Sequence, residues 1–155
     1  MTEKKEFKNQ FSWSFSRHNS FETCKRKYYY SYYGCWGGWD KNADEKIKTL
    51  YALNKMTSLP MLAGSIVHDE VERTLKILRY GRKADPEQSR KNVIKNFKQS
   101  WNQSRNKEWE DSPKWKTNLF EHFYNQKPSD DKLLETRDLM LNSIDGFFAS
   151  DSYRF

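Results

Sequence analysis

The sequence predicts an all-α fold of five or six helices, and three observations lead to it. Apolar residues recur every three or four positions along most of the 155-residue chain, which is the spacing of an amphipathic helix. No segment alternates apolar and polar residues as a half-buried strand does, and no internal repeat or low-complexity linker is present. Ser, Asp, Pro and Gly residues stand where such helices would begin and end. Residues 1–155 are therefore expected to form a single helical domain.

The first predicted helix begins at Ser14 or Ser16, either of which can cap it, and runs to about Tyr33 before Gly34 ends it. The side chains expected on its buried stripe are Phe21, Cys24, Tyr28 and Tyr32. A loop, "GCWGGWD", follows because three glycines in five residues break any helical pattern.

Two helices with clear start signals come next. Asp44 is expected to cap a short helix through Met56. Ser58 and Pro60 then start the longest predicted helix, which ends at Gly81. Its expected apolar stripe consists of Ala63, Val67, Val71, Leu75 and Leu78.

The second half of the chain is predicted to hold three further helices. Asp85 and Pro86 open one that reaches about Arg105, and Ser112 with Pro113 start a short one containing "LFEHFY". The last runs from a cap at Ser129 to about residue 149. The apolar residues expected to bury it are Leu133, Met140, Ile144 and Phe147.

Composition limits the class of protein. Two cysteines are too few for a disulfide scaffold, no apolar run reaches membrane-spanning length, and the N-terminal residues do not resemble a secretion signal. We therefore expect a soluble, cytoplasmic protein with no membrane partner. The formal net charge of +7 favours an anionic partner, and residues 76–107 carry ten Lys/Arg against two acidic residues.

Two basic segments are candidates for nucleic-acid binding. Lys91, Lys95 and Lys98 fall on one helical face together with Arg105, and such a face suits a phosphate backbone as well as it suits plain solvation. "CKRKYYYSYYG" mixes three cations with five tyrosines, a combination found in proteins that bind single strands.

Gly64, His68 and Glu72 are spaced four apart, so they lie along one line of the longest helix. Imidazole and carboxylate could there reach one metal ion, and glycine would allow a backbone or phosphate to approach closely. On spacing alone, a histidine at the core edge bonded to a local carboxylate is the favoured reading. No catalytic triad, P-loop, dinucleotide-binding or zinc pattern occurs elsewhere.

The chain resembles the N-terminal part of a RecB-like nuclease of the PD-(D/E)XK superfamily. "SWSFSRHNSFETCKRKYYYSYYG" is similar to the opening helix of that family, and "GSIVHDEVE" is similar to its glycine-x-x-x-histidine helix. "LFEHFY" and the closing "DGFFASDSYRF" resemble a subgroup with a helical insertion before the catalytic strands.

The resemblance implies roles for particular residues. His68 would be a ligand of a catalytic Mg²⁺ or Mn²⁺ and Glu72 a helper, which reverses the reading from spacing alone. Gly64 would be a point of close approach. The opening helix would lie near DNA, so that Arg17 and the run Lys25, Arg26 and Lys27 contact phosphates.

The catalytic aspartate and glutamate-x-lysine of that family, which lie on adjacent strands, are not found in the sequence. We therefore expect a truncated or split nuclease, inactive alone, with the catalytic sheet supplied by further chain or by a separate chain. An iron-sulfur cluster is not expected, because the three additional cysteines that some relatives use are absent. The alternative function is a non-enzymatic helical module that binds single-stranded nucleic acid, and a third is a protein-binding scaffold.

Overall fold

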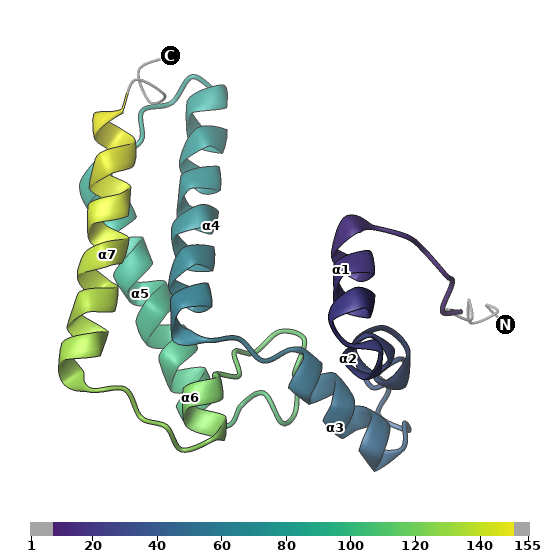
Figure 1. The fold of residues 1–155 in the computed structure, drawn as a ribbon. Helices are drawn as coiled ribbons and strands as arrows, with labels where there is room; N and C mark the ends of the chain where they lie inside the picture. The colour runs from purple at the N-terminus through teal and green to yellow at the C-terminus, as the bar shows by residue number, and fades with distance from the viewer. Residues whose placement is uncertain (1–7, 151–155) are drawn as a thin grey trace, which may run out of the picture. The chain divides into compact units, whose positions relative to one another are not determined.

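The computed structural model describes residues 8–150, and within them every regular element is helical, which confirms the predicted all-α class (Figure 1). A single β-bridge, between Thr57 and Leu119, is the only strand-like pairing in that range. None of the helices in this part of the chain is long and apolar enough to cross a membrane. The last five residues of the closing motif, 151–155, lie outside the described residues.

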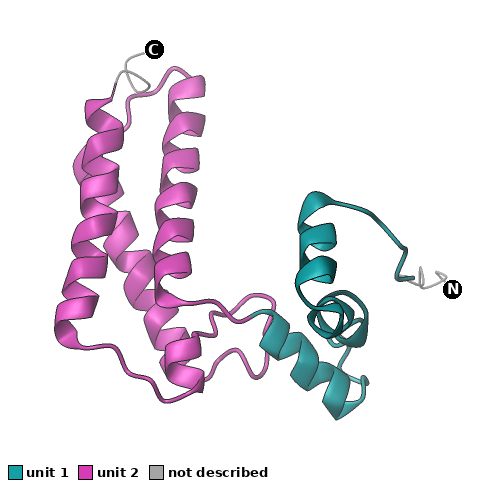
Figure 2. Ribbon diagram, in the orientation of Figure 1, with its two compact units in different colours: residues 1–55 teal, residues 56–155 magenta. Residues whose placement is uncertain are grey.

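The chain divides into two compact units (Figure 2). Unit 1, residues 1–55, contains the following helices: α1 (Phe15–Thr23), α2 (Lys25–Tyr29), the π-helix η1 (Tyr30–Gly34) and α3 (Glu45–Asn54). Unit 2, residues 56–155, contains α4 (Leu59–Arg79), α5 (Pro86–Arg105), α6 (Phe120–Phe123) and α7 (Asp130–Ala149).

The first predicted helix is broken at Cys24, contrary to the expectation of one continuous helix. Cys24 adopts an extended backbone (φ −163°, ψ 106°), which ends α1. Its thiol then caps α2 by accepting a hydrogen bond from the Lys27 N–H at 3.4 Å. The periodic pattern resumes at once in α2, which is why the sequence does not reveal the break. The expected buried stripe is also wrong in part, since Phe21 and Cys24 are exposed and only Tyr28 and Tyr32 are half-buried.

Unit 1 closes around Tyr51 of α3, which is buried together with Cys35. The glycine-rich loop reaches this side chain because Gly38 has no Cβ. A Cβ at Gly38 would lie 2.4 Å from Tyr51 Cβ and 2.6 Å from the Ile47 carbonyl oxygen, too close for any other residue. Trp39 then packs edge-on against Tyr51, with ring centroids 5.8 Å apart.

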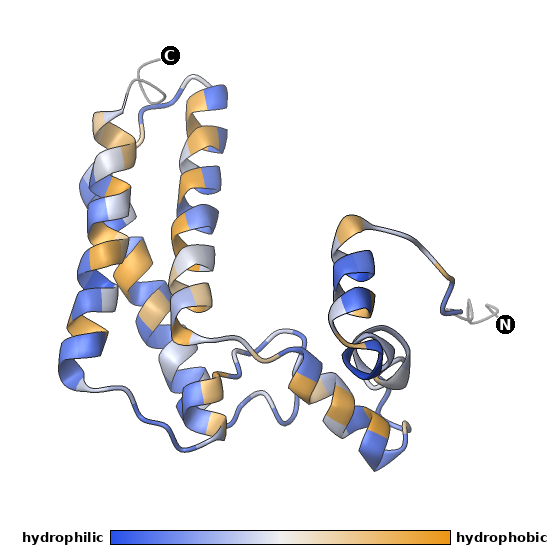
Figure 3. Cartoon of the chain, viewed as in Figure 1, coloured by the Kyte–Doolittle hydropathy of each residue, from blue (hydrophilic) through white to orange (hydrophobic). Residues whose placement is uncertain are grey.

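Unit 2 is a three-helix bundle of α4, α5 and α7 (Figure 3). Each long helix begins at the predicted cap: the side chains of Ser58, Asp85 and Ser129 all accept a backbone N–H of the first turn. The buried core is formed by Leu62, Ala63, Ile66, Val93, Leu119, Met140 and Ile144.

The buried face of α4 is rotated relative to the predicted stripe. Leu75 was expected in the core but is 46% exposed, whereas Glu70 and Thr74 are buried. The reason is that α4 packs against two helices at once, so its buried face is wider than a single apolar stripe. This wider buried face includes the polar residues Glu70 and Thr74.

The segment that starts at Ser112 and Pro113 was expected to be helical, but only Phe120–Phe123 forms helix. Hydrogen bonds instead join the backbone of this segment to the start of unit 2. The Thr57 N–H donates to the Asn118 carbonyl at 2.9 Å, and the Phe120 N–H donates to the Thr57 carbonyl at 3.0 Å. These bonds hold Leu119 in an extended conformation with its side chain fully buried, and an extended residue cannot continue a helix.

Candidate functional site

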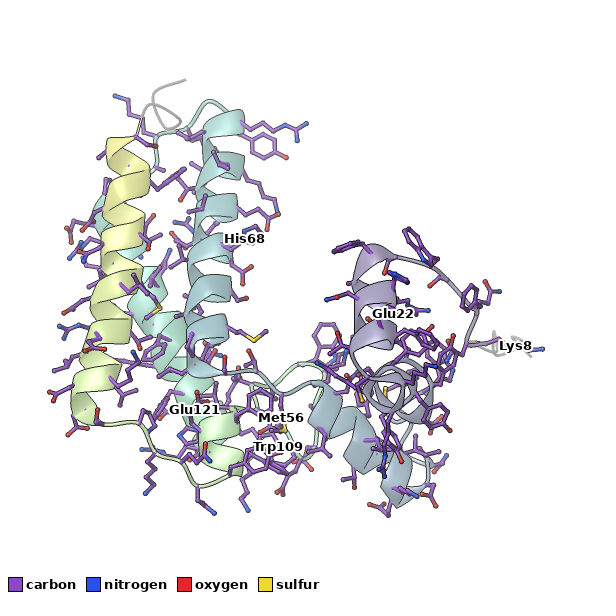
Figure 4. All side chains as sticks on the ribbon, viewed as in Figure 1. Lys8, Glu22, Met56, His68, Trp109 and Glu121 are labelled. Carbon is purple, nitrogen blue, oxygen red and sulfur yellow. The ribbon has the colours of Figure 1, made fainter. Side chains whose placement is uncertain are left out.

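Gly64, His68 and Glu72 form one line along α4 because they are spaced four apart, and all three are exposed to solvent. The opposite face of the helix carries Ala63 and Ile66 into the core. His68 points away from α7 in Figure 4 and is open to solvent. It therefore does not have the environment of a core-edge histidine, which was the alternative from spacing alone.

Glu72 is paired with a lysine on its own helix. Its carboxylate forms an ion pair with Lys76, whose Nζ lies 2.5 Å from Oε1. The hydrogen bond and charge of Lys76 lower the pKa of Glu72, and the proximity of His68 lowers it further. Glu72 is thus an ionised carboxylate close enough to His68 to interact with it electrostatically, and Lys76 competes for it.

A divalent cation finds only part of a site here. Mg²⁺ and Mn²⁺ prefer several oxygen ligands, and the exposed line offers one imidazole and one carboxylate. Among residues 8–150, no group of three or more His, Cys, Asp and Glu side chains could hold a metal ion. The two side chains thus fit one edge of a metal site but do not make one alone.

Gly64 borders an open groove of about 450 Å³ between α4 and α7. The groove wall is largely apolar and includes Val67 and Leu139, the latter 65% exposed. A Cβ added at Gly64 would meet no atom within 4 Å. Packing within the described chain therefore does not require glycine at this position.

Replacing Gly64 with alanine is expected to stabilise the chain by about 1 kcal/mol, because alanine favours the helix and nothing obstructs its methyl group. Urea denaturation followed by circular dichroism measures the change. Ser65→Ala, at an exposed neighbouring position, is the control and should change stability by less than about 0.5 kcal/mol. A loss of stability in Gly64→Ala would mean that folding itself needs the glycine.

The four residues of the predicted basic face, Lys91, Lys95, Lys98 and Arg105, are all exposed on the continuous helix α5. Lys91, Lys95 and Lys98 are exposed, and no ion pair joins them to a carboxylate anywhere in residues 8–150. They line an open groove of about 540 Å³ whose apolar wall includes Ile94 and Leu141. We name these three lysines the α5 ridge. Arg105 lies apart from it, beside a different cavity.

In unit 1 the predicted phosphate contacts lie against aromatic rings. Arg17 stands over the Tyr32 ring at 4.4 Å from the ring centroid, and Lys25 stands 5.4 Å from the centroid of Phe21. Arg26 lies 5.9 Å from the Tyr30 ring in the same manner, and Lys27 is exposed. Lys25 and Arg26 are exposed as well, whereas Arg17 is half-buried and its Nη1 donates to the Ser12 carbonyl at 3.0 Å.

The structure adds two aromatic residues that sequence reasoning missed. Phe11 and Trp13 are 76% and 72% exposed and line a cavity of about 310 Å³ that also includes Arg17 and Phe21. The available signal was "FSW" at residues 11–13, which ends before α1 begins at Phe15 and therefore has no helical face on which to bury its rings. Exposed rings beside cations form a surface on which unpaired bases can stack.

Comparison with known proteins identifies the family. The family model of the PD-(D/E)XK nuclease superfamily matches residues 12–138, which include most of both units. The chain therefore belongs to the PD-(D/E)XK nuclease superfamily. Searches of curated proteins and of solved structures give no match.

Proposed function

We propose that this chain is the helical N-terminal portion of a RecB-like, metal-dependent DNA nuclease and that it does not cleave DNA by itself. Membership in a nuclease superfamily supports phosphodiester hydrolysis as the chemistry of the complete enzyme. The helical character of residues 8–150 supports a role beside the catalytic sheet rather than within it.

The observation that carries the proposal is the outward line of Gly64, His68 and Glu72 on α4. A helix interior disfavours glycine, and no contact in the described chain requires one at position 64. A glycine one turn before an exposed histidine is accounted for if another backbone or a phosphate approaches closely there. His68 would then hold Mg²⁺ or Mn²⁺ with Glu72 as its helper, and Glu72 would have to give up its ion pair with Lys76.

The remaining ligands would come from the strands that carry the aspartate and glutamate-x-lysine of the family. These strands belong either to further sequence of the same protein or to a separate chain. The apolar groove beside Gly64 is the surface on which such strands would pack. The metal ion would supply charge stabilisation at the scissile phosphate, while this chain contributes His68 and basic residues that position DNA.

The test is a DNA cleavage assay with the chain alone and with the polypeptide that completes it. That polypeptide is sought in the reading frame after codon 155 and in neighbouring frames, as strands with an aspartate and a glutamate-x-lysine. The chain alone should leave DNA intact in Mn²⁺ or Mg²⁺. The completed protein should cleave it, and His68→Ala should reduce the rate by about 100-fold or more, the effect of losing a group from a metal site.

Asp69→Ala is the matched control, because Asp69 is the exposed neighbour of His68 on the same helix and has no part in the proposed site. It should cleave at the wild-type rate. The proposal fails if the chain alone cleaves DNA and His68→Ala cleaves equally well, or if the completed protein is indifferent to His68→Ala.

A second candidate function is a non-enzymatic module that binds single-stranded nucleic acid. The α5 ridge favours it, since three lysines without carboxylate partners in the described chain can exchange their counterions for phosphates. The exposed rings of Phe11 and Trp13 favour single strands, whose bases are free to stack. Under this function His68→Ala leaves binding unchanged.

A further inference from the structure

A separate cavity lies at the end of unit 2 where α5 stops and α6 begins. It has a volume of about 320 Å³, which is within the size range of small-ligand sites. Figure 4 labels two of its residues, Trp109 and Glu121, near α6. No residue of the α5 ridge or of the His68 line contributes to it, so it is a distinct site.

Three cations surround this cavity: Arg105, Lys107 and Lys127. Their only ion pair with a carboxylate in the described chain is a long one, 3.9 Å between Lys107 Nζ and Glu110. Two carboxylates, Glu110 and Glu121, also line the cavity, and Glu121 Oε1 accepts the Leu59 N–H at 2.8 Å. The three cations outnumber these two carboxylates, so the lining carries a net positive charge.

Lys107 occupies a backbone conformation that normally selects glycine. Its φ is +57°, and it directly follows the end of α5. The Glu108 N–H donates back to the Gln103 carbonyl at 3.0 Å, a helix ending in which glycine is the usual residue at the left-handed position. Glycine would suit this backbone better than the lysine that occupies it.

The cavity also has an aromatic wall and a buried polar side. The rings of Trp109 and Phe123 lie 5.9 Å apart at 52° to each other. His122 is fixed beside them by a 2.8 Å hydrogen bond between its Nδ1 and the Ser104 hydroxyl. Glu121 Oε2 is buried and has no hydrogen-bond partner, so the carboxylate can accept a donor from a ligand with a small side-chain movement.

We propose that this cavity binds a nucleoside monophosphate group. The base lies against Trp109 and Phe123, and the phosphate is held by Arg105, Lys107 and Lys127. Glu121 accepts a hydrogen bond from a ribose hydroxyl or a base amino group. An aromatic surface next to clustered cations matches this ligand, because the base supplies a flat apolar face and the phosphate supplies charge. The group belongs either to a free mononucleotide or to the phosphorylated end of a strand.

The test is calorimetric titration of the full chain with AMP, with adenosine and with inorganic phosphate. AMP should bind, and adenosine and phosphate should each bind about tenfold more weakly or worse, since each lacks one half of the recognised group. Lys107→Gly and Trp109→Ala should each weaken AMP binding by about tenfold. Lys114→Ala is the control, because Lys114 belongs to the same loop but lies over Trp115 outside the cavity.

The Lys107→Gly variant separates binding from folding. Glycine suits the left-handed backbone, so this variant should unfold at the same or a higher urea concentration than the wild type. A loss of AMP binding in a variant of undiminished stability would show that the Lys107 side chain takes part in binding. If AMP does not bind, or if it binds equally well to Lys107→Gly and Trp109→Ala, the proposal is wrong.

A ten-nucleotide single strand, with and without a 5′-phosphate, shows whether the bound group belongs to a free mononucleotide or to the phosphorylated end of a strand. These titrations use the variant Lys91→Glu/Lys95→Glu/Lys98→Glu, so that the α5 ridge does not contribute. Tighter binding of the phosphorylated strand than of both AMP and the unphosphorylated strand assigns the cavity to strand ends. Tighter binding of AMP assigns it to free nucleotides, and failure of both again overturns the proposal.

Discussion

Arg73→Ala is expected to lower the free energy of unfolding of unit 2 by about 3 kcal/mol, the cost of leaving a buried charge without its partner. The side chain of Glu70 is only 2% exposed. Arg73 binds it with two hydrogen bonds, from Nε at 2.9 Å and from Nη2 at 2.5 Å. Without the guanidinium, the carboxylate keeps only the weaker donors Asn92, whose amide lies at 3.3 Å, and the Ser89 hydroxyl.

The pKa of Glu70 gives this prediction a pH dependence. Burial raises that pKa, but the hydrogen bonds and charge of Arg73, with Ser89 and Asn92, outweigh burial and lower it below the ordinary value. A carboxyl group with a lowered pKa stabilises the fold above its unfolded pKa of about 4.5, and this stability is lost as the pH falls through the folded pKa. The difference in the free energy of unfolding between wild type and Arg73→Ala should therefore become smaller in acid, because a protonated Glu70 is neutral and needs no cation beside it.

Hydrogen-deuterium exchange of the α4 amides measures the effect, since it reports on unit 2 without assuming that both units unfold together. Arg79→Ala is the control: Arg79 is exposed on the same helix and forms no ion pair in the described chain. Equal protection of α4 in wild type and Arg73→Ala at pH 7 would show that the pair contributes nothing to stability.

The long helices were predictable because each has a local start signal. Ser58, Asp85 and Ser129 all cap as expected. Of the four residues expected to bury α7, Met140 and Ile144 lie in the core, whereas Leu133 and Phe147 are only half-buried. Glu70 was not predictable in the same way. A charged residue in a helix is normally assigned to solvent, and only the packing of α5 against α4 brings Asn92 within reach of it.

Of the candidate sites, the parts set by one helix were predictable and the parts set by tertiary structure were not. Four-residue spacing alone puts Gly64, His68 and Glu72 on one line. The cavity at the end of α5 depends on the path of residues 106–119. Backbone hydrogen bonds to Thr57, rather than a pattern of side chains, determine that path. The residues of the cavity therefore carried no recognisable spacing in the sequence.

Reversing the charge of the α5 ridge, in Lys91→Glu/Lys95→Glu/Lys98→Glu, is expected to weaken binding of a 20-nucleotide single strand by about 100-fold or more at physiological salt. The lysines have no carboxylate partners within residues 8–150, so in the free protein their charge is balanced by mobile counterions. Phosphates replace those counterions, and each contact with a single strand contributes about 0.7 to the slope of log K against log salt. Losing three contacts should reduce that slope by about 2.

Fluorescence anisotropy at several salt concentrations measures both quantities. Lys41→Glu/Lys46→Glu/Lys114→Glu changes the net charge equally at exposed positions that are not part of the ridge, and it should weaken binding far less. If the two triple variants weaken binding equally, net charge rather than the ridge determines affinity. If the wild-type chain binds no strand even at low salt, neither nucleic-acid function holds for the isolated chain, and a protein-binding scaffold becomes the better account.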